Sequence, residues 1–298
     1  MTEKIKITFL GTSDAVPTAE RNHTSIWLNF AGENILIDCG EGTQRQIRKA
    51  KLNPCKITRI LITHWHADHI LGIPGLLKTL AMSGYNKTMQ IYGPKGTKFL
   101  MNAISKLFAI HDAFKIEVHE VSGKFFETKE FYLEAEKMTH GVPCNAYAFV
   151  KKGQIRIDKT RLRKLKIKEG AHLKDLKHGK NIKYNGKIYR AKDLTYDEGE
   201  KKVSFVFDTK INEKIVPFVK NSDIFVCEAS SVDEETAKRY QHMMAEQAAE
   251  IAKKAKVKKL ILSHISQRVE RDLNGNLTKA KKKFVNTIVS KDLYSLEI

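Results

Sequence analysis

The sequence predicts a mixed α/β fold, on two observations. Short, apolar, β-branched runs recur along the 298-residue chain and alternate with segments whose apolar residues have helical spacing. A strongly basic stretch interrupts this alternation, and the pattern resumes after it. We therefore expect a single α/β domain over residues 1–298, with an insertion at 151–200.

The elements follow from these patterns in chain order. We expect strands at residues 5–10, 35–37, 57–63 and 89–92, and helices at 42–50 and 94–110. A region rich in strand-forming residues covers 114–150. Beyond the insertion we expect strands at 203–207, 224–227 and 260–262, and one long helix at about 233–254.

Composition favours an intracellular protein with a sizeable core. Hydrophobic residues make up 42% of the chain. The four cysteines, Cys39, Cys55, Cys144 and Cys227, are widely spaced and are expected to be reduced thiols. The first residues do not resemble a signal peptide, and no apolar run approaches the ~18 residues of a membrane span. We therefore expect a cytoplasmic location without membrane contact.

The net charge of +19 is concentrated in the insertion. Residues 151–192 contain 16 Lys or Arg and 3 Asp or Glu, a net charge of +13. A lysine-biased proteome could produce a basic surface, but it would not concentrate the charge in one segment. The natural partner of such a block is a polyanion, so we expect nucleic acid binding.

Three imidazoles and one carboxylate lie within six positions, from His64 to His69. The run follows the apolar strand at 57–62, so it is expected at the end of a buried strand. His64 and His66 can converge on one ion, while Asp68 and His69 turn toward a second. Imidazole and carboxylate are ligands for zinc and other first-row metals, whereas a histidine-rich surface loop would arise only by chance.

Other metal-capable side chains stand near the ends of later strands. His140 begins a short loop, and Asp208 and His264 each follow an apolar strand. Side chains at strand ends can gather at one edge of an α/β sheet. With the first motif they provide five histidines and two aspartates, enough for two ions that share one carboxylate.

These motifs resemble the metallo-β-lactamase superfamily and, within it, the ribonuclease Z family, which removes 3′ trailers from transfer RNA precursors. The H-x-H-x-D-H run is common to the superfamily, whereas two other segments, residues 17–22 and 40–46, are more specific to ribonuclease Z. The resemblance covers nearly the whole chain and rests on residues 9–12, 16–22, 36–46, 64–69, 140, 207–209 and 263–268.

The resemblance implies a four-layer αβ/βα sandwich with two zinc ions, manganese or iron being possible instead. One ion would be held by His64, His66 and His140, the other by Asp68, His69 and His264, with Asp208 bridging. Asp38 would orient a histidine ligand, and Asp68 would also accept a proton. Glu228 would orient His242, which would protonate the departing oxygen, leaving a 3′-hydroxyl on the transfer RNA and a 5′-phosphate on the trailer.

The resemblance also implies a homodimer whose insertion is a flexible exosite arm for transfer RNA. Lys164, Lys166 and Lys168 in this arm are expected to contact RNA. Arg21 and Asn22 are expected near the cut, although a salt bridge is an equally good interpretation of Arg21. The remaining histidines, His23, His111, His119, His172 and His178, match no motif and are expected to be ordinary surface or packing residues.

Two other functions remain open at this point. A different metallo-β-lactamase-fold hydrolase, such as a phosphodiesterase or an arylsulfatase-like enzyme, would share every metal ligand but would not need the basic insertion. A noncatalytic RNA-binding protein would need the insertion but not a leaving-group acid such as His242.

Overall fold

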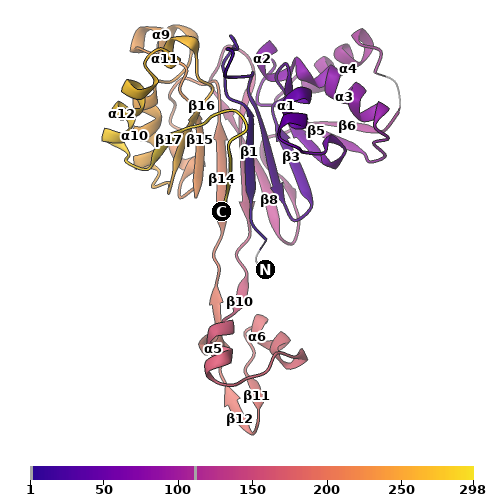
Figure 1. The fold of residues 1–298 in the computed structure, drawn as a ribbon, viewed down its shortest axis with the longest axis vertical. Coiled ribbons are helices and arrows are strands. Elements are labelled where there is room, and N and C mark those ends of the chain that lie inside the picture. Colours follow the sequence, from indigo (N-terminus) through magenta and orange to yellow (C-terminus); the bar gives the residue numbers. More distant parts are fainter. Residues whose placement is uncertain (1–2, 111–112) are drawn as a thin grey trace. The chain divides into compact units, whose positions relative to one another are not determined.

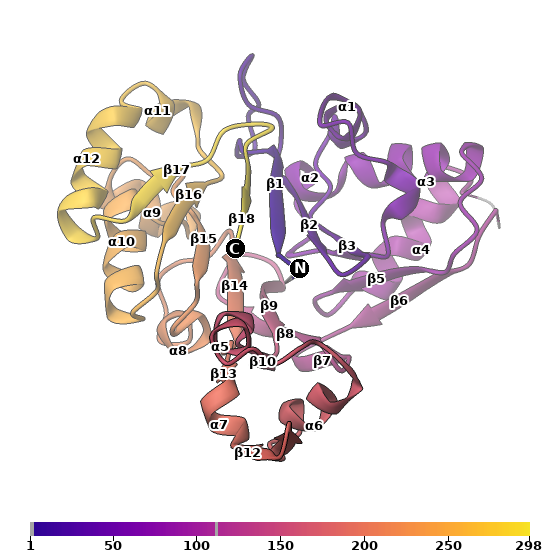
Figure 2. The ribbon, with the colours of Figure 1, turned by 60° about the horizontal axis from the view of Figure 1, so that its bottom comes forward.

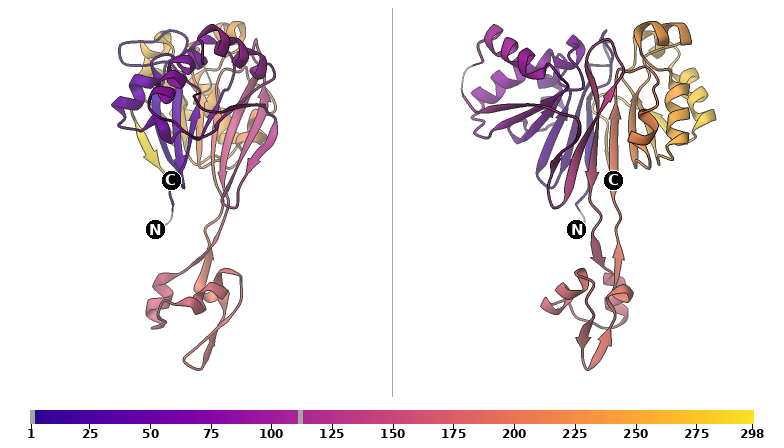
Figure 3. Two further views of the ribbon diagram at one scale, coloured as in Figure 1. Left: turned by 90° about the vertical axis from the view of Figure 1, so that its right-hand side faces the viewer. Right: turned by 180° about the vertical axis from the view of Figure 1, so that it is seen from behind.

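The computed structural model describes residues 3–110 and 113–298, and its core consists of two seven-stranded sheets packed face to face. Helices cover the outer faces of the sheets, giving the layer order α, β, β, α (Figures 1 and 3). This is the four-layer αβ/βα sandwich that the sequence led us to expect. In the described part of the chain, no helix is long and apolar enough to cross a membrane.

The first sheet contains the N-terminal strands and the last strand of the chain. β18 pairs antiparallel with β1, which brings the C-terminal segment beside the N-terminal strand (Figure 2). β3, β4, β5 and β6 pair in parallel. In sheet order the strands are β18 (Ser295–Glu297), β1 (Lys6–Gly11), β2 (Ser25–Phe30), β3 (Glu33–Ile37), β4 (Arg59–Leu61), β5 (Met89–Gly93) and β6 (Ile116–Glu120).

The second sheet is formed by the remaining strands of the core. β14, β15, β16 and β17 run parallel, so their carboxyl ends meet at one edge. In sheet order the strands are β17 (Thr287–Val289), β16 (Leu260–Ser263), β15 (Ile224–Glu228), β14 (Lys201–Val206), β9 (Cys144–Lys151), β8 (Phe131–Met138) and β7 (Gly123–Glu127).

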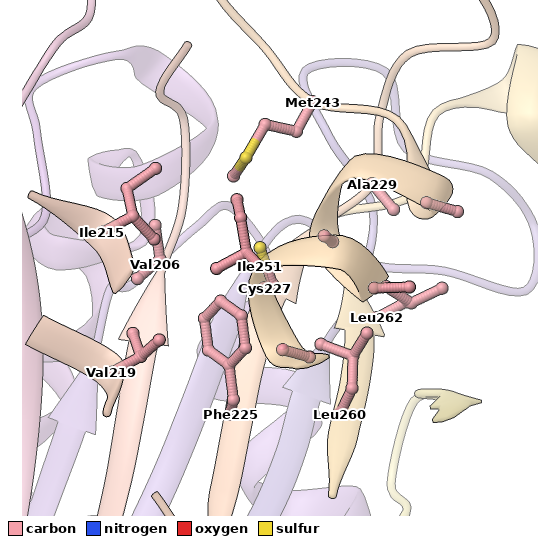
Figure 4. Close-up of a cluster of buried hydrophobic side chains, with 14 of the residues drawn as sticks. Val206, Ile215, Val219, Phe225, Cys227, Ala229, Met243, Ile251, Leu260 and Leu262 are labelled. Atoms are coloured by element: carbon pink, nitrogen blue, oxygen red, sulfur yellow. The ribbon is translucent and has the colours of Figure 1, made fainter. Parts of the chain in front are cut away.

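Each sheet packs against its own group of helices. With the first sheet are α1 (Thr43–Lys49), η1 (Pro54–Lys56), α2 (Ala67–Ile70), α3 (Gly72–Met82) and α4 (Thr97–Leu107). With the second are α8 (Ile215–Val219), α9 (Glu234–Tyr240), α10 (Ala245–Lys254), α11 (Gln267–Glu270) and α12 (Leu273–Lys283). Figure 4 shows how Val219 of α8 and Ile251 of α10 lie beside Phe225 of β15 in the hydrophobic core between the second sheet and its helices.

The two sheets are tied together directly beneath the histidine motif. The buried Tyr147 of β9 donates its hydroxyl to the carbonyl of Ile62 at 2.8 Å, and Asn145 N–H donates to the carbonyl of Thr63 at 2.9 Å. Full burial of such a ring contributes roughly 1.5–3 kcal/mol. The chain that leads into His64 is therefore fixed from the opposite sheet.

Residues Thr128–Tyr132 and Val150–Lys201 form a second compact unit with a core of its own. Leu162, Leu176 and Leu194 are buried in this core. Asn185 and Gly186, with φ of 47° and 77°, form the two-residue turn of a hairpin. The elements of this second unit are β10 (Ile155–Ile157), α5 (Lys159–Lys164), η2 (Ala171–Leu173), α6 (Lys174–Lys177), β11 (Ile182–Tyr184), β12 (Lys187–Tyr189), α7 (Ala191–Leu194) and β13 (Thr195–Asp197).

The prediction of one long helix at about 233–254 is wrong, because the structure has two helices there, α9 and α10. Gln241 has a φ of 59°, in the left-handed region, which cannot continue a right-handed helix. Met243 is then buried in the hydrophobic core between the second sheet and its helices, and its carbonyl accepts a hydrogen bond from Ser231 N–H at 3.1 Å. Tertiary packing overrides the helical periodicity here, and His242 consequently lies in the linker between the helices.

A close backbone approach at Gly72 gives the first prediction. A Cβ at Gly72 would lie 2.2 Å from the carbonyl oxygen of Gly40, so Gly72→Ala must push α3 away from the loop after β3. We expect the free energy of unfolding, measured by urea denaturation, to fall by about 1–3 kcal/mol. Gly141→Ala is the matched control, since its Cβ would meet no atom within 4 Å. Equal stability of the two variants would contradict this packing argument.

Candidate metal centre and active site

The metal-capable side chains meet where several strands of both sheets end. The loop after β4 and the short helix α2 provide four of them, the loop between β8 and β9 provides one, and the residues after β14 and β16 provide two. All seven expected ligands come together in two clusters that share one aspartate: His64, His66, His140, Asp68, His69, His264 and Asp208.

The first cluster consists of His64, His66 and His140 around one oxygen of Asp208. Asp208 Oδ2 lies 3.4 Å from His64 Nε2 and 3.8 Å from His140 Nε2. His66 Nδ1 lies 3.0 Å from His64 Nε2 and 3.2 Å from His140 Nε2. Three imidazole nitrogens and a carboxylate oxygen thus converge on one point.

The second cluster uses the other oxygen of Asp208. Asp208 Oδ1 lies 2.9 Å from His264 Nε2 and 3.6 Å from His69 Nε2. Asp68 Oδ2 lies 3.2 Å from His69 Nε2 and 3.8 Å from His264 Nε2. Asp208 therefore faces one cluster with each of its oxygens, which is the geometry a bridging carboxylate needs.

The donor atoms of these clusters fit metal ions. Within each cluster the candidate ligand atoms lie within 4.8 Å of one another. His69 Nε2 is buried and makes no hydrogen bond, although its ring is held firmly through Nδ1. Imidazole nitrogen with carboxylate oxygen is a donor set that suits zinc and other first-row divalent ions. The fold and these clusters together support a metal cofactor.

Asp38 orients His69 directly and His64 through Thr63. Its φ of 55° turns the chain at the end of β3. Asp38 Oδ2 accepts from His69 Nδ1 at 2.7 Å and from the Thr63 hydroxyl at 2.8 Å. Since Thr63 donates to Asp38, it accepts from His64 Nδ1 at 3.1 Å. Both rings then carry their proton on Nδ1 and present the lone pair of Nε2 to the clusters.

Thr24 plays the same part for His264, although no pattern in the sequence indicates it. The Thr24 hydroxyl donates to the carbonyl of Ser13 at 2.8 Å and accepts from His264 Nδ1 at 2.7 Å. His264 Nε2 is thereby left as an acceptor facing Asp208. A single threonine carries no recognisable pattern in a sequence, so only the fold could identify it.

The carboxylates and imidazoles of the clusters stabilise one another electrostatically. Burial disfavours the charged form of Asp208, but the facing imidazoles of His264, His69 and His64 outweigh this and hold its pKa well below the usual range. For Asp68, burial is likewise outweighed, chiefly by His69, and the pKa is lowered. Burial lowers the pKa of His64 to about 4, which keeps that ring neutral. Burial opposes a charge on His69 and His264, but the facing carboxylate of Asp208 outweighs it and raises the pKa of both rings. A bound cation would take the place of these protons beside the carboxylates.

Glu228 and His242 form a hydrogen-bonded pair beside the clusters. The buried Glu228 accepts from Thr209 N–H at 2.8 Å, from the Ser230 hydroxyl at 2.7 Å and from His242 Nδ1 at 2.9 Å. Burial opposes a charge on His242, but the Glu228 carboxylate outweighs it and raises the pKa of His242 to about 10. The ring centroid lies 5.4 Å from that of His140, so a protonated imidazole stands next to the metal ligands.

Arg21 is not free to contact RNA as expected, whereas the RNA contact expected of the half-buried Asn22 stays a prediction. The Arg21 guanidinium is only 4% exposed and donates to Glu270 at 2.9 Å, to Thr12 and to a main-chain carbonyl. The backbone N–H of Asn22 donates to Asp292 at 2.8 Å, and its side chain donates to the carbonyl of Glu41. The ion-pair interpretation of Arg21 is correct, and both residues tie the N-terminal loop to the C-terminal segment.

The remaining expected residues occupy simpler surroundings. Lys164, Lys166 and Lys168 are exposed on the second unit. His119 stacks on Tyr92, His172 stacks on Tyr184, His23 lies 3.3 Å from the carbonyl of Ala15, and His178 is exposed. None of these four histidines belongs to a cluster among the described residues, and His111 lies outside them.

Comparison with solved structures places the fold. Human tRNase Z, short form (ELAC1), superposes with a TM-score of 0.70 at 24% identity and 98% coverage of each chain. The metallo-β-lactamase fold protein YhfI from Bacillus subtilis gives a TM-score of 0.71 at 18% identity, with both chains fully covered. The protein therefore has the metallo-β-lactamase fold.

Sequence comparison places the family. Residues 5–155 match the family model described as Anti-Pycsar protein Apyc1, and the chain belongs to the family that this model describes. Ribonuclease Z of Pyrococcus horikoshii is 40% identical over 271 residues, 89% of this chain and 87% of that protein. Ribonuclease Z of Methanothermobacter thermautotrophicus is 36% identical over 298 residues, 99% of this chain and 97% of that protein. This chain belongs to the ribonuclease Z family of endoribonucleases.

Proposed function

We propose that this endoribonuclease removes the 3′ trailer from transfer RNA precursors, leaving a 3′-hydroxyl on the transfer RNA and a 5′-phosphate on the trailer. The observation that carries this proposal is the pairing of two metal-capable clusters with a buried Glu228–His242 pair. The similarity in fold to human tRNase Z supports the choice of substrate. A purely RNA-binding protein has no use for a protonated histidine beside a metal centre.

The two clusters support the proposed ligand sets. His64, His66 and His140 would hold one zinc ion, Asp68, His69 and His264 the other, and Asp208 would bind both. Zinc fits this set of imidazole and carboxylate donors, and manganese or iron would also fit. Such ions, when bound, make a water nucleophilic at neutral pH and offset charge on the attacked phosphate.

The side chains of this chain divide the proton transfers between them. Asp68 Oδ2 faces the second cluster and would accept the proton of an attacking water. His242 uses Nδ1 for Glu228, so its Nε2–H is the group that can protonate the departing 3′ oxygen. Asp38, Thr63 and Thr24 act through the histidines they orient, as positioning residues.

The second unit is the proposed binding site for the body of transfer RNA, an exosite formed by residues 151–200. Lys164, Lys166 and Lys168 are exposed, and no acidic side chain forms an ion pair with them among the described residues. Uncompensated lysines suit backbone phosphates, which position an RNA without reading its sequence.

We also propose that the protein is a homodimer, as the resemblance to ribonuclease Z implies. Exposed apolar side chains on α4, Phe99 and Leu107, would be covered most simply by another protein surface. Light scattering on the purified protein tests this proposal, and a monomeric mass at micromolar concentration would contradict it.

A cytoplasmic location is the last proposal from the sequence. All four cysteines are unpaired, and three of them are buried. Free thiols are the usual state in a reducing compartment. Cell fractionation with a marker for each compartment tests this location.

Mapping of product ends tests the proposed reaction. The wild-type protein loaded with zinc should cut a trailer-bearing precursor once, at the 3′ end of the transfer RNA. Asp68→Ala should lower the single-turnover rate by at least about 100-fold while RNA binding persists, because a proton acceptor and ligand is lost. Asp272→Ala, which removes a helix-capping carboxylate outside both clusters, is the control. Cuts elsewhere, or full activity of Asp68→Ala, would contradict the proposal.

The Glu228–His242 pair predicts a change in pH dependence. An acid catalyst must be protonated, so wild-type turnover should fall only as pH rises toward the pKa of His242, about 10. Glu228→Gln removes the charge that raises this pKa, which then falls toward the ordinary value of 6.5 or below. The descending limb of kcat against pH should move to lower pH by more than about two units. An unchanged limb would show that His242 is not the acid.

The exosite proposal predicts a salt effect. Replacing Lys164, Lys166 and Lys168 together by Gln should weaken precursor binding on the order of 10–100-fold at low salt. The slope of log K against log salt should decrease in magnitude by about 2–3, since up to three phosphate contacts are lost. The same substitutions at Lys279, Lys281 and Lys282 of α12 are the control for net charge. Equal losses in the two triple variants would mean that only overall charge matters.

A further inference from the structure

A cavity lies beside His242. The described residues that form its wall do not include any member of the two metal-capable clusters. Its volume is about 450 Å³, which is within the range of small-ligand sites and admits a single nucleoside. The linker after α9 contributes Tyr240 and His242 to its wall, and the loop after β1 contributes Val16. Ser231 and Gln267 add polar groups from the segments that follow β15 and β16.

The break between α9 and α10 directs two side chains into this cavity. Tyr240 is the last residue of α9, and the left-handed Gln241 turns the chain so that His242 lines the same space. His242 Nδ1 is taken by Glu228, which leaves Nε2 as the only ring nitrogen available to a ligand. An aromatic ring and the proposed acid thus border one cavity.

Tyr240 and Val16 present exposed side chains to the cavity. Tyr240 is 52% exposed and Val16 is 51% exposed, so the cavity that they line opens to solvent. The Arg239 guanidinium lies 5.5 Å from the centroid of the Tyr240 ring, within cation–π range. An exposed aromatic ring is a stacking surface for a nucleobase.

The loop that contributes Val16 is held in place by hydrogen bonds. Ser13 donates its hydroxyl to the carbonyl of Val16 at 2.8 Å, and Val16 N–H donates to Asp14 at 3.1 Å. The backbone N–H of Asp14 donates to the carbonyl of Ile265, next to metal-cluster residue His264, at 3.4 Å. The cavity wall is therefore built before any ligand enters.

We propose that this cavity binds the nucleoside on the 5′ side of the cut, with its base stacked on Tyr240. This inference rests on the proposed function, because the oxygen that His242 protonates is the 3′ oxygen of that nucleoside. Its ribose must then lie within hydrogen-bond distance of His242, and its base enters the adjoining cavity. Ser231 and Gln267 offer hydrogen bonds to the sugar or the base edge, while stacking tolerates any base.

The test combines a protein variant with a change in the RNA. Zinc-loaded full-length protein is given precursor transfer RNA that carries either the natural base or an abasic ribose at the nucleotide 5′ of the cut. For the wild type we expect the abasic RNA to lower kcat/KM by roughly 5–100-fold. Tyr240→Ala should cause a loss of similar size on the natural RNA and little further loss on the abasic RNA.

Two further variants separate stacking from folding. Tyr240→Phe keeps the aromatic face and should retain the dependence on the base. Tyr240→Leu keeps apolar bulk without an aromatic face and should lose the dependence on the base. Equal urea midpoints for the variants would confirm that each is folded, and the ratio of natural to abasic rates is insensitive to the fraction of active protein.

The outcomes distinguish this proposal from the proposed function. If Tyr240→Ala loses the same factor on natural and abasic RNA, Tyr240 does not stack on that base and the proposal is overturned. If dependence on Tyr240 follows an abasic ribose at the nucleotide 3′ of the cut instead, the cavity holds the trailer and the proposal is also overturned. Failure of the wild type to cut the natural precursor would reject the proposed function itself.

Discussion

The site depends on the contacts that the carboxylate of Asp208 makes with both metal-capable clusters. Its Oδ2 faces His64 and His140, and its Oδ1 faces His69 and His264, so one side chain joins two clusters. A buried carboxylate is costly unless charges or ions compensate it. The imidazoles of His264, His69 and His64 compensate the charge of Asp208 in part. Asp68 adds a second negative charge, which makes the site suited to cations.

The two-sheet scaffold explains why these side chains can meet. The histidine motif leaves the first sheet after β4, whereas Asp208 and His264 leave the second sheet after β14 and β16. The hydrogen bonds from Tyr147 and Asn145 fix the start of the motif from the opposite sheet. Positions set by parallel strands and buried hydrogen bonds are more reproducible than positions on loops alone, which suits a site with narrow geometric tolerance.

The sequence was sufficient for the fold class and for the set of metal-capable residues, since strand-end histidines and aspartates carry a clear pattern. It was insufficient where tertiary contacts decide. The helix expected at 233–254 is divided because Met243 packs into the core, and this moves His242 and Tyr240 to the wall of a cavity. Thr24 has no sequence signature, and Arg21 was expected at the RNA although it is buried against Glu270. A basic side chain can serve either an ion pair or a phosphate, and only its burial distinguishes the two.

The central claim is that Asp208 holds two metal ions together, and native mass spectrometry of the zinc-loaded protein tests it most directly. We expect two ions per wild-type chain, and we expect Asp208→Ala to retain fewer than two, because each cluster loses one carboxylate oxygen. Asp272→Ala should retain two, since that carboxylate only caps a helix. Two tightly held ions in Asp208→Ala would contradict the account.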